Sequence, residues 1–164
     1  MATEEYIRSL FDYEPETGIV RRKVGRRGHA AGEVAGWTRQ DGYRIIRIKK
    51  QDFLAHRIAW LIMTGRWPPD QIDHKNHDPS DNRWDNLRQA TSAENNQNSR
   101  KKRPTTIYKG VYRTPSSRWY SMIYVNNTQT YLGAYSTPEE AARAYKEASI
   151  KYFGQYAHYD DPDQ

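Results

Sequence analysis

The residues best suited to chemistry lie in one short stretch that brings an acid, an imidazole and several amides close together. Asp73 and His74 are adjacent, an Asn-rich loop follows them, and Asn86 and Asn95 come after it. Carboxylate and amide oxygens suit Mg²⁺ or Mn²⁺ better than zinc. A histidine, with a reference pKa of about 6.5, can take a proton from water. We therefore expect a centre that holds one divalent cation and one general base.

These groups match the needs of phosphodiester hydrolysis. The reaction needs an activated water, charge neutralisation at phosphorus and help for the departing oxygen, and a metal ion on the scissile phosphate supplies the last two. Adjacent strand residues point to opposite faces, so Asp73 and His74 can share a site only if the strand ends or twists there, or if the metal lies at its edge. The alternative is that the Asp and Asn residues here are ordinary turn residues and that His74 is structural.

The composition favours a polyanionic partner. The chain has 164 residues, enough for one domain or two small ones, and a formal net charge of +6 at pH 7. Only 36% of the residues are hydrophobic, yet 13% are aromatic, which argues for folded units rather than a disordered basic tail. The absence of cysteine excludes disulfides and Cys-based zinc sites. Without a signal-like N-terminus or an apolar run of about 20 residues, we expect a soluble, cytoplasmic protein that is neither secreted nor in a membrane.

The first third of the chain predicts a small β-rich region followed by a helix. Residues 4–11 have helical spacing, residues 19–24 favour a strand, and residues 34–38 and 43–48 favour a strand pair joined through Asp41-Gly42. Between residues 21 and 50 there are ten Lys or Arg and two acids. This is either a solvated sheet face or, as we favour, a surface for the DNA backbone. Residues 53–65 predict a helix that ends at Gly65. His56 and Arg57 lie near its start, where they could contact phosphate, although a lone His on such a helix is more often a packed or capping residue.

The spacing of the candidate residues resembles the HNH motif of ββα-metal nucleases. Asn86 stands thirteen residues after Asp73, and Asn95 nine residues further on. The pattern is most similar to that of phage homing endonucleases, which write the motif as His-Asn-Asn. The framing residues over 53–98 agree with that family: Ala55-His56-Arg57, Trp67-Pro68, Ile72-Asp73-His74, Asp81-Asn82-Arg83, Asn86-Leu87-Arg88, Ala90-Thr91 and Glu94-Asn95.

The resemblance implies a role for each residue. His74 is the general base, and Asp73 and Asn95 are ligands of one divalent cation, Mg²⁺ or Mn²⁺. Asn86 fixes the loop between the two strands by side-chain to backbone hydrogen bonds and so positions His74. Because Asn95 stands where many members have His, we expect tight metal binding only with the DNA phosphate in place.

The last third of the chain predicts three strands and a helix. Residues 108–113, 118–125 and 130–135 favour strands, and Thr137-Pro138-Glu139-Glu140 has the pattern of a capping box. The helix should end at Gly154 and bury a stripe on one face of the sheet, leaving the other face uncovered. That stripe comprises Ala141, Ala144, Tyr145, Ala148 and Tyr152. We expect the tyrosines at 135, 145 and 152 to belong to the core.

This segment resembles the DNA-binding domain of plant ethylene-response factors, the APETALA-two family. The residues that carry the resemblance over 108–159 include Tyr108-Lys109-Gly110-Val111, Arg118-Trp119, Tyr131-Leu132-Gly133 and Glu139-Glu140-Ala141-Ala142. It implies a sheet that lies in the major groove of DNA, although Tyr112 departs from the usual Arg. The implied contacts are Lys109, Arg113, Arg118, Trp119, Ser121, Tyr124 and Tyr131. Alternatively, the aromatic face packs on the rest of the chain.

Together these patterns predict an α+β protein in four parts. They are an N-terminal basic β-rich region (1–52), a ββα-metal (HNH) nuclease core (53–98), a basic linker (99–106) and a three-stranded antiparallel sheet packed on one helix (107–160). The linker residues Arg100, Lys101, Lys102 and Arg103 are further predicted DNA contacts.

We predict a homing-type endonuclease that nicks double-stranded DNA as a monomer in a phage-infected or bacterial host cell. Two alternatives remain open. One is a non-catalytic DNA-binding regulator with an inert HNH shell, and the other is an RNA-binding ribosomal accessory protein.

Overall fold

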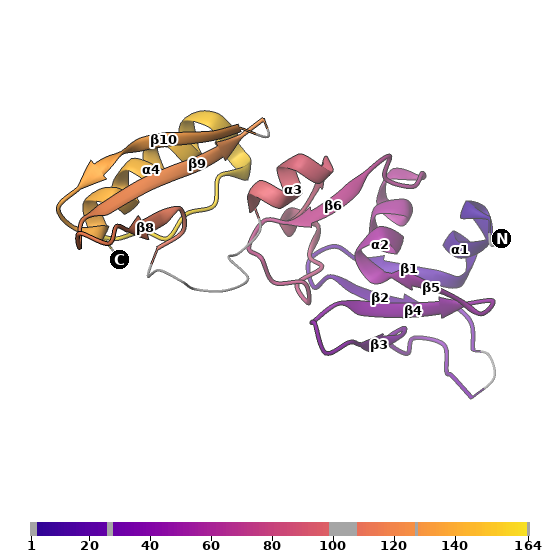
Figure 1. The fold of residues 1–164 in the computed structure, drawn as a ribbon. Coiled ribbons are helices and arrows are strands. Elements are labelled where there is room, and N and C mark those ends of the chain that lie inside the picture. The colour runs from indigo at the N-terminus through magenta and orange to yellow at the C-terminus, as the bar shows by residue number, and fades with distance from the viewer. Residues whose placement is uncertain (1–2, 26–27, 99–107, 127, 164) are drawn as a thin grey trace. The chain divides into compact units, whose positions relative to one another are not determined.

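The computed structural model describes residues 3–25, 28–98, 108–126 and 128–163 (Figure 1). The fold mixes helices and strands, as predicted, and the chain divides into two compact units, Met1–Ser92 and Ala93–Gln164. Within the described ranges, no helix combines the length and the apolar character needed to cross a membrane.

The first unit is built from short strands around one central helix. Its elements are α1 (Glu4–Leu10), β1 (Phe11–Glu14), β2 (Ile19–Arg22), β3 (Trp37–Thr38), β4 (Arg44–Ile48), β5 (Gln51–Leu54), α2 (Ala55–Thr64), β6 (Gln71–His74), the 3₁₀ turn η1 (Trp84–Asn86) and β7 (Leu87–Ala90). The strands β1 and β2 pair antiparallel, and β3, β4 and β5 form a second antiparallel sheet in that order.

The hairpin of β4 and β5 corrects the sequence analysis, which predicted a helix from residue 53. Phe53 lies in β5 and pairs with Ile46, and the helix α2 begins only at Ala55. The turn of this hairpin is Lys49-Lys50, and both residues have positive φ, 47° and 68°. Two-residue turns of this kind usually carry Asn-Gly or a similar pair. Because lysines occupy this turn, the sequence analysis did not predict the hairpin.

One hydrophobic core joins the N-terminal strands to α2 and so crosses residue 52, where we drew a predicted boundary. Its largest members are Ile7, Phe11, Ile46, Ile58 and Leu61, each at most 1% exposed. Burying an aliphatic or aromatic side chain of this size stabilises the fold by about 1.5–3 kcal/mol. Gly65 ends α2 in the left-handed conformation, with φ of 79°, and its backbone N–H donates to Leu61, which confirms the predicted stop.

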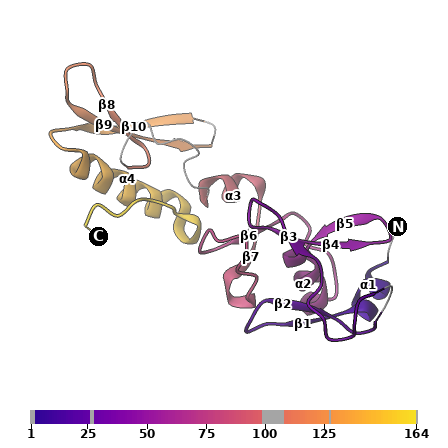
Figure 2. The same cartoon turned by 90° about the horizontal axis from the view of Figure 1, so that it is seen from below.

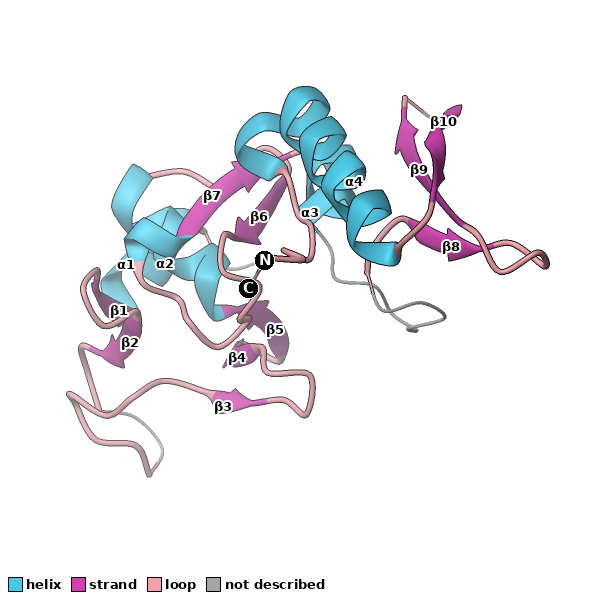
Figure 3. Cartoon of the chain, turned by 90° about the vertical axis from the view of Figure 1, so that its left-hand side faces the viewer, coloured by secondary structure: helices cyan, strands magenta, loops and turns pink. Residues whose placement is uncertain are grey.

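The strands β6 and β7 form a separate antiparallel pair, visible side by side in Figure 3. Ile72 and Leu87 from this pair pack with Ala59 of α2, and Trp60 and Trp84 cover the contact with ring centroids 5.1 Å apart. This small second cluster ties the strand pair to the central helix. The helix α3 (Ser92–Asn98) follows β7 in the chain.

The second unit is a three-stranded antiparallel sheet with a helix along one face (Figure 2). The strands β8 (Val111–Arg113), β9 (Trp119–Val125) and β10 (Thr128–Tyr135) lie in the order β10-β9-β8, and the helix is α4 (Pro138–Phe153), followed by the 3₁₀ turn η2 (Gly154–Tyr156). The predicted capping box at Thr137 and Glu140 is confirmed, and Gly154 ends the helix.

The buried face of α4 departs from the predicted stripe at one end. Tyr145 is buried as expected, but Tyr152 is 46% exposed, so its assignment to the core was wrong. The physical reason is that Phe153 and Tyr159 pack against the core cluster of Ile123 and Tyr145 in that part of the unit.

Candidate functional site

Asp73 and His74 are the last two residues of β6, and both side chains are buried, at 6% and 5% exposure. The strand thus ends at His74, which is one of the conditions for the two residues to serve one site. The Nε2 atom of His74 lies 3.1 Å from the Oδ1 atom of Asn82. With an amide oxygen facing it, Nε2 carries the proton, and Nδ1 is then the ring nitrogen with a lone pair to accept one.

Asn82 is itself held in place by the N-terminal hairpin. Its backbone carbonyl accepts a 2.6 Å hydrogen bond from the Tyr13 hydroxyl of β1. Burial raises the pKa of Tyr13, and the nearby Asp81 and Asp85 raise it further, so the hydroxyl stays protonated as a donor. At Gly18, which has φ of 75°, an added Cβ would lie 2.4 Å from the backbone of Asn82. The β1–β2 hairpin therefore holds Asn82, the hydrogen-bond partner of His74, in place.

Asn86 organises the loop between β6 and β7 with both ends of its amide. Its Oδ1 accepts from the backbone N–H of Asn76 at 3.0 Å, and its Nδ2 donates to the carbonyl of Asp81 at 2.7 Å. These are the side-chain to backbone hydrogen bonds that the sequence analysis predicted. In the same loop, Arg83 donates to both carboxylate oxygens of Asp81 and lowers the pKa of that carboxyl to about 2.

Asp73 is paired with Arg88, the residue directly opposite it on β7. The Nη2 and Nε atoms of Arg88 donate to Oδ2 of Asp73 at 2.6 and 2.7 Å, and the two side chains are 10% and 6% exposed. A guanidinium in this geometry fixes the orientation of a buried carboxylate. We call Asp73, His74, Asn82, Asn86 and Arg88 the candidate centre.

The donor set of the candidate centre fits a hard cation shared with phosphate. Asp73 supplies a carboxylate to the centre, and oxygen is the ligand atom that Mg²⁺ and Mn²⁺ prefer. Within the described ranges, no three or more His, Cys, Asp or Glu side chains are grouped so as to hold an ion. Asn95, the other predicted ligand, is half-buried on α3 and belongs to the second unit, so its pairing with Asp73 stays a prediction.

A cluster of rings surrounds His74. The His56 ring lies edge-on to it, with centroids 5.0 Å apart and planes at 87°, and Tyr43 approaches both rings at 5.7 and 6.0 Å. Burial, together with smaller effects of His74 and Arg57, lowers the pKa of His56 to about 3. We predicted His56 and Arg57 as phosphate contacts. His56 is only 4% exposed and packs on His74, while Arg57 donates to the carbonyl of Asp70 at 2.9 Å.

The predicted DNA contacts of the second unit divide into accessible and enclosed residues. Arg113 and Arg118 are exposed, as are Tyr124 and Tyr131 at 56% and 60%. Ser121 is fully buried and donates to the carbonyl of Gly110 at 3.3 Å.

Two further predicted contacts are partly enclosed. Trp119 packs against the cluster around Val111. Burial lowers the pKa of Lys109 to about 8, and its backbone N–H donates to Asp160 at 2.6 Å. The predicted linker contacts Arg100, Lys101, Lys102 and Arg103 lie outside the described residues.

Sequence reasoning missed several residues that the fold brings to these sites. It treated Asn82 and Arg88 only as framing residues, and it gave Tyr43 no role in the centre. In the second unit, Tyr112, Tyr120 and Tyr131 form a ladder of rings across the sheet, with centroids 5.4 and 6.5 Å apart. On β9 the alternation with buried Ser121 and Ile123 places Tyr120 on the face away from α4. The strand alternation was the available signal for the tyrosines. No local signal existed for the partners of His74 and Asp73.

Comparison with known proteins finds similarities in the middle of the chain. Residues 53–97 match the family model described as HNH endonuclease. An uncharacterised HNH endonuclease of Acanthamoeba polyphaga mimivirus is 31% identical over 104 residues, which is 62% of this chain and 54% of the relative. Both similarities support a nuclease at the level of the family.

Plant proteins match a shorter part of the chain. A rice protein described as containing AP2/ERF and B3 domains is 40% identical over 55 residues, and an Arabidopsis thaliana AP2/ERF and B3 domain-containing transcription factor is 42% identical over 52 residues. These segments cover 34% and 32% of this chain but only 17% and 15% of the plant proteins. No solved structure gives a significant match.

Proposed function

We propose that the protein is a metal-dependent DNA endonuclease in which His74 is the general base. The observation that carries the proposal is the buried frame around His74. It lies at the end of β6, hydrogen-bonded to Asn82 and packed on His56, within the segment that matches the HNH family. A general base must be held in orientation close to the reacting water, and a ring fixed on two sides meets that condition.

We assign the cation to Asp73 and Asn95, with phosphate oxygens of the DNA completing its shell. Mg²⁺ or Mn²⁺ bound there would polarise the scissile phosphate and stabilise the departing oxygen. The other residues of the candidate centre hold the metal ligand and the general base in position. Arg88 orients Asp73, Asn86 fixes the loop after the strand, and His74 accepts the proton of the attacking water at Nδ1.

We further propose that the substrate is double-stranded DNA, which the uncovered face of the second unit binds in the major groove. The tyrosine ladder of that face and the exposed Arg113 and Arg118 of the same unit support this, together with the partial matches to plant AP2/ERF proteins. Cations contact phosphates, while aromatic side chains offer apolar contacts to base edges. With one candidate centre in the chain, a monomer would nick one strand, as homing-type enzymes of this pattern are expected to do.

Plasmid nicking with Mg²⁺ tests the proposal. We expect His74→Ala to lower the nicking rate by about 10²–10⁴-fold, which is the usual contribution of a general base. The matched control is His77→Asn in the same loop, because His77 has φ of 63° and Asn tolerates that conformation. The control should nick like the wild type, and chelation of the metal should stop both. If wild type and His74→Ala bind DNA equally and neither nicks, the protein is a DNA-binding regulator instead.

A further inference from the structure

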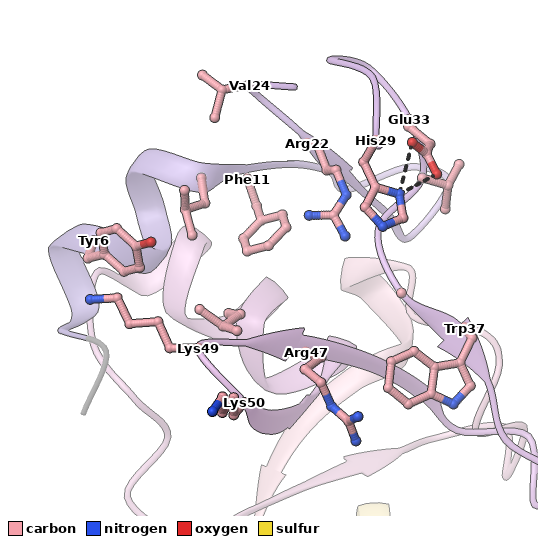
Figure 4. A pocket seen from close by; sticks show the side chains of 14 residues that line it. Tyr6, Phe11, Arg22, Val24, His29, Glu33, Trp37, Arg47, Lys49 and Lys50 are labelled. Carbon is pink, nitrogen blue, oxygen red and sulfur yellow. Dashed lines mark hydrogen bonds and ion pairs between the residues drawn. The ribbon is translucent and has the colours of Figure 1, made fainter. Parts of the chain in front are cut away.

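A second feature of the first unit is a cavity of about 790 Å³ that shares no residue with the candidate centre. Figure 4 shows side chains from α1, β1, β2, β3 and the β4–β5 turn around it. We call it the N-terminal cavity. The lining residues that matter here are Tyr6, Phe11, Arg22, Trp37, Lys49 and Lys50. Its volume lies within the range of small-molecule sites, about 300–1,000 Å³.

Of the cations that line the N-terminal cavity, Arg47 is paired with Asp52, but three others are not held in ion pairs within the described residues. In the part of the chain that the structure describes, Arg22, Lys49 and Lys50 form no ion pair. The buried Nε atom of Arg22 has no hydrogen-bond acceptor there either. The acid in the lining, Glu33, is already bound by Nδ1 of His29 at 3.0 Å and by a backbone N–H. The charge of Glu33 partly offsets that of Arg22, and guanidinium and ammonium groups outside ion pairs suit a phosphate.

Aromatic rings line the same space and hold the cations in place. The Nζ atom of Lys49 lies 4.0 Å from the centroid of the Tyr6 ring, and the guanidinium of Arg22 lies 5.9 Å from that of Phe11. Phe11 is buried and forms an apolar floor, whereas Trp37 is 44% exposed and carries the guanidinium of Arg47 5.4 Å from its ring centroid. Sites for unpaired nucleotides combine an aromatic surface for the base with cations for the backbone.

The backbone also indicates that the lysines serve a ligand. Lys49 and Lys50 occupy the two turn positions with positive φ, where side chains other than Asn, Asp and Gly are disfavoured. Strained backbone of this kind is found mainly at functional sites. The turn brings both ammonium groups to the N-terminal cavity (Figure 4).

We propose that the N-terminal cavity binds an unpaired nucleotide of the DNA, with its base against Trp37 and its phosphate at Arg22, Lys49 and Lys50. A base inside an intact duplex is stacked on both faces, so only an unstacked nucleotide can offer a face to an indole. The inference rests on the proposed function in taking DNA as the partner, but it requires no cleavage.

The test is DNA binding by the full chain in EDTA, measured by fluorescence anisotropy. Two probes are compared, an intact duplex and the same duplex with one unpaired thymidine. We expect Trp37→Ala to weaken binding of the second probe about tenfold, in line with the loss of one stacked base. Trp37→Phe, which keeps an aromatic ring, should retain most of the affinity. Binding of the intact duplex should be unchanged in both variants.

The cationic half of the site is tested with the double variant Lys49→Asn, Lys50→Gly, for which the turn geometry is favourable. It should weaken binding of both probes and reduce the salt dependence of binding, because two phosphate contacts are lost. The matched control is Arg66→Ala, which removes an exposed cation of the same unit that does not line the N-terminal cavity. Arg66→Ala should leave the affinity difference between the two probes unchanged. Adding Trp37→Ala to this variant should reduce that difference as it does in the wild type.

Three results would overturn the proposal. The first is that Trp37→Ala leaves binding of the second probe unchanged. The second is that Trp37→Ala weakens both probes equally, which would make the surface an ordinary backbone contact. The third is that free thymidine monophosphate competes at micromolar concentration, which would assign the site to a free nucleotide. The proposed function is tested independently. If the wild type does not nick plasmid, the endonuclease proposal is refuted, but the binding comparison of the two probes still tests the nucleotide site.

Discussion

The candidate centre and the N-terminal cavity lie in one unit and treat charge in opposite ways. In the candidate centre each ionised or polar side chain is buried against a fixed partner, as Asp73 is against Arg88 and His74 is against Asn82. In the N-terminal cavity Arg22, Lys49 and Lys50 line a large opening, and the rings of Phe11 and Tyr6 lie against the first two. The difference teaches that chemistry needs groups of fixed position and protonation, whereas binding a polyanion needs charge that nothing else neutralises.

The largest expected effect on stability comes from breaking the buried pair of the candidate centre. Arg88→Ala should lower the free energy of unfolding by about 3–5 kcal/mol, because it leaves the Asp73 carboxylate buried without its guanidinium. Urea denaturation measures the loss. The matched control is Arg39→Ala, which breaks the exposed pair with Asp41 and should have a much smaller effect. Equal losses of unfolding free energy in Arg88→Ala and Arg39→Ala would mean that burial does not decide how much each ion pair stabilises the fold.

A smaller loss is expected from the amide that orders the loop. Asn86→Ala removes both hydrogen bonds of the side chain and leaves the backbone N–H of Asn76 and the carbonyl of Asp81 without this partner. The free energy of unfolding should fall by about 2 kcal/mol, and nicking should fall more than DNA binding does. Nicking at the wild-type rate would contradict the role of Asn86 in placing His74.

The buried His56 predicts a dependence of stability on pH. Because burial lowers its pKa to about 3, the folded state keeps the ring neutral while the unfolded state takes up a proton near pH 6.5. The stability that depends on neutral His56 is therefore complete above pH 6.5 and is lost as the pH falls. Between pH 7 and 5 the free energy of unfolding should drop by about 2 kcal/mol. Denaturation of His56→Gln should show a flatter profile, and an unchanged profile would contradict the prediction.

The smallest predicted change in the free energy of unfolding is an increase rather than a decrease. Replacing Lys49-Lys50 by Asn-Gly should raise the free energy of unfolding by about 1 kcal/mol, because both positions have positive φ and this pair favours such a turn. The same variant should bind DNA less tightly. A gain in stability at a loss of binding is the behaviour expected of residues kept for function. Calorimetry together with the anisotropy assay measures both changes.

Local patterns predicted much of the fold but not the partners within it. The capping box at Thr137, the stop at Gly65 and the strands of the second unit follow from neighbours in the chain, so they could be read from spacing alone. The β4–β5 hairpin could not, because lysines occupy its turn. Tyr152 shared the helical stripe but not the core, since Phe153 and Tyr159 pack there instead.

The sequence by itself determined which residue types could perform hydrolysis, because Asp73, His74, Asn86 and Asn95 follow a spacing that resembles a known motif. Only the tertiary structure decided what surrounds them. Arg88 meets Asp73 across a strand register, Tyr13 supports Asn82 from 69 residues away, and His56 packs on His74 from a separate helix. Such contacts depend on how buried elements pack, and packing is a property of the whole core rather than of any short stretch.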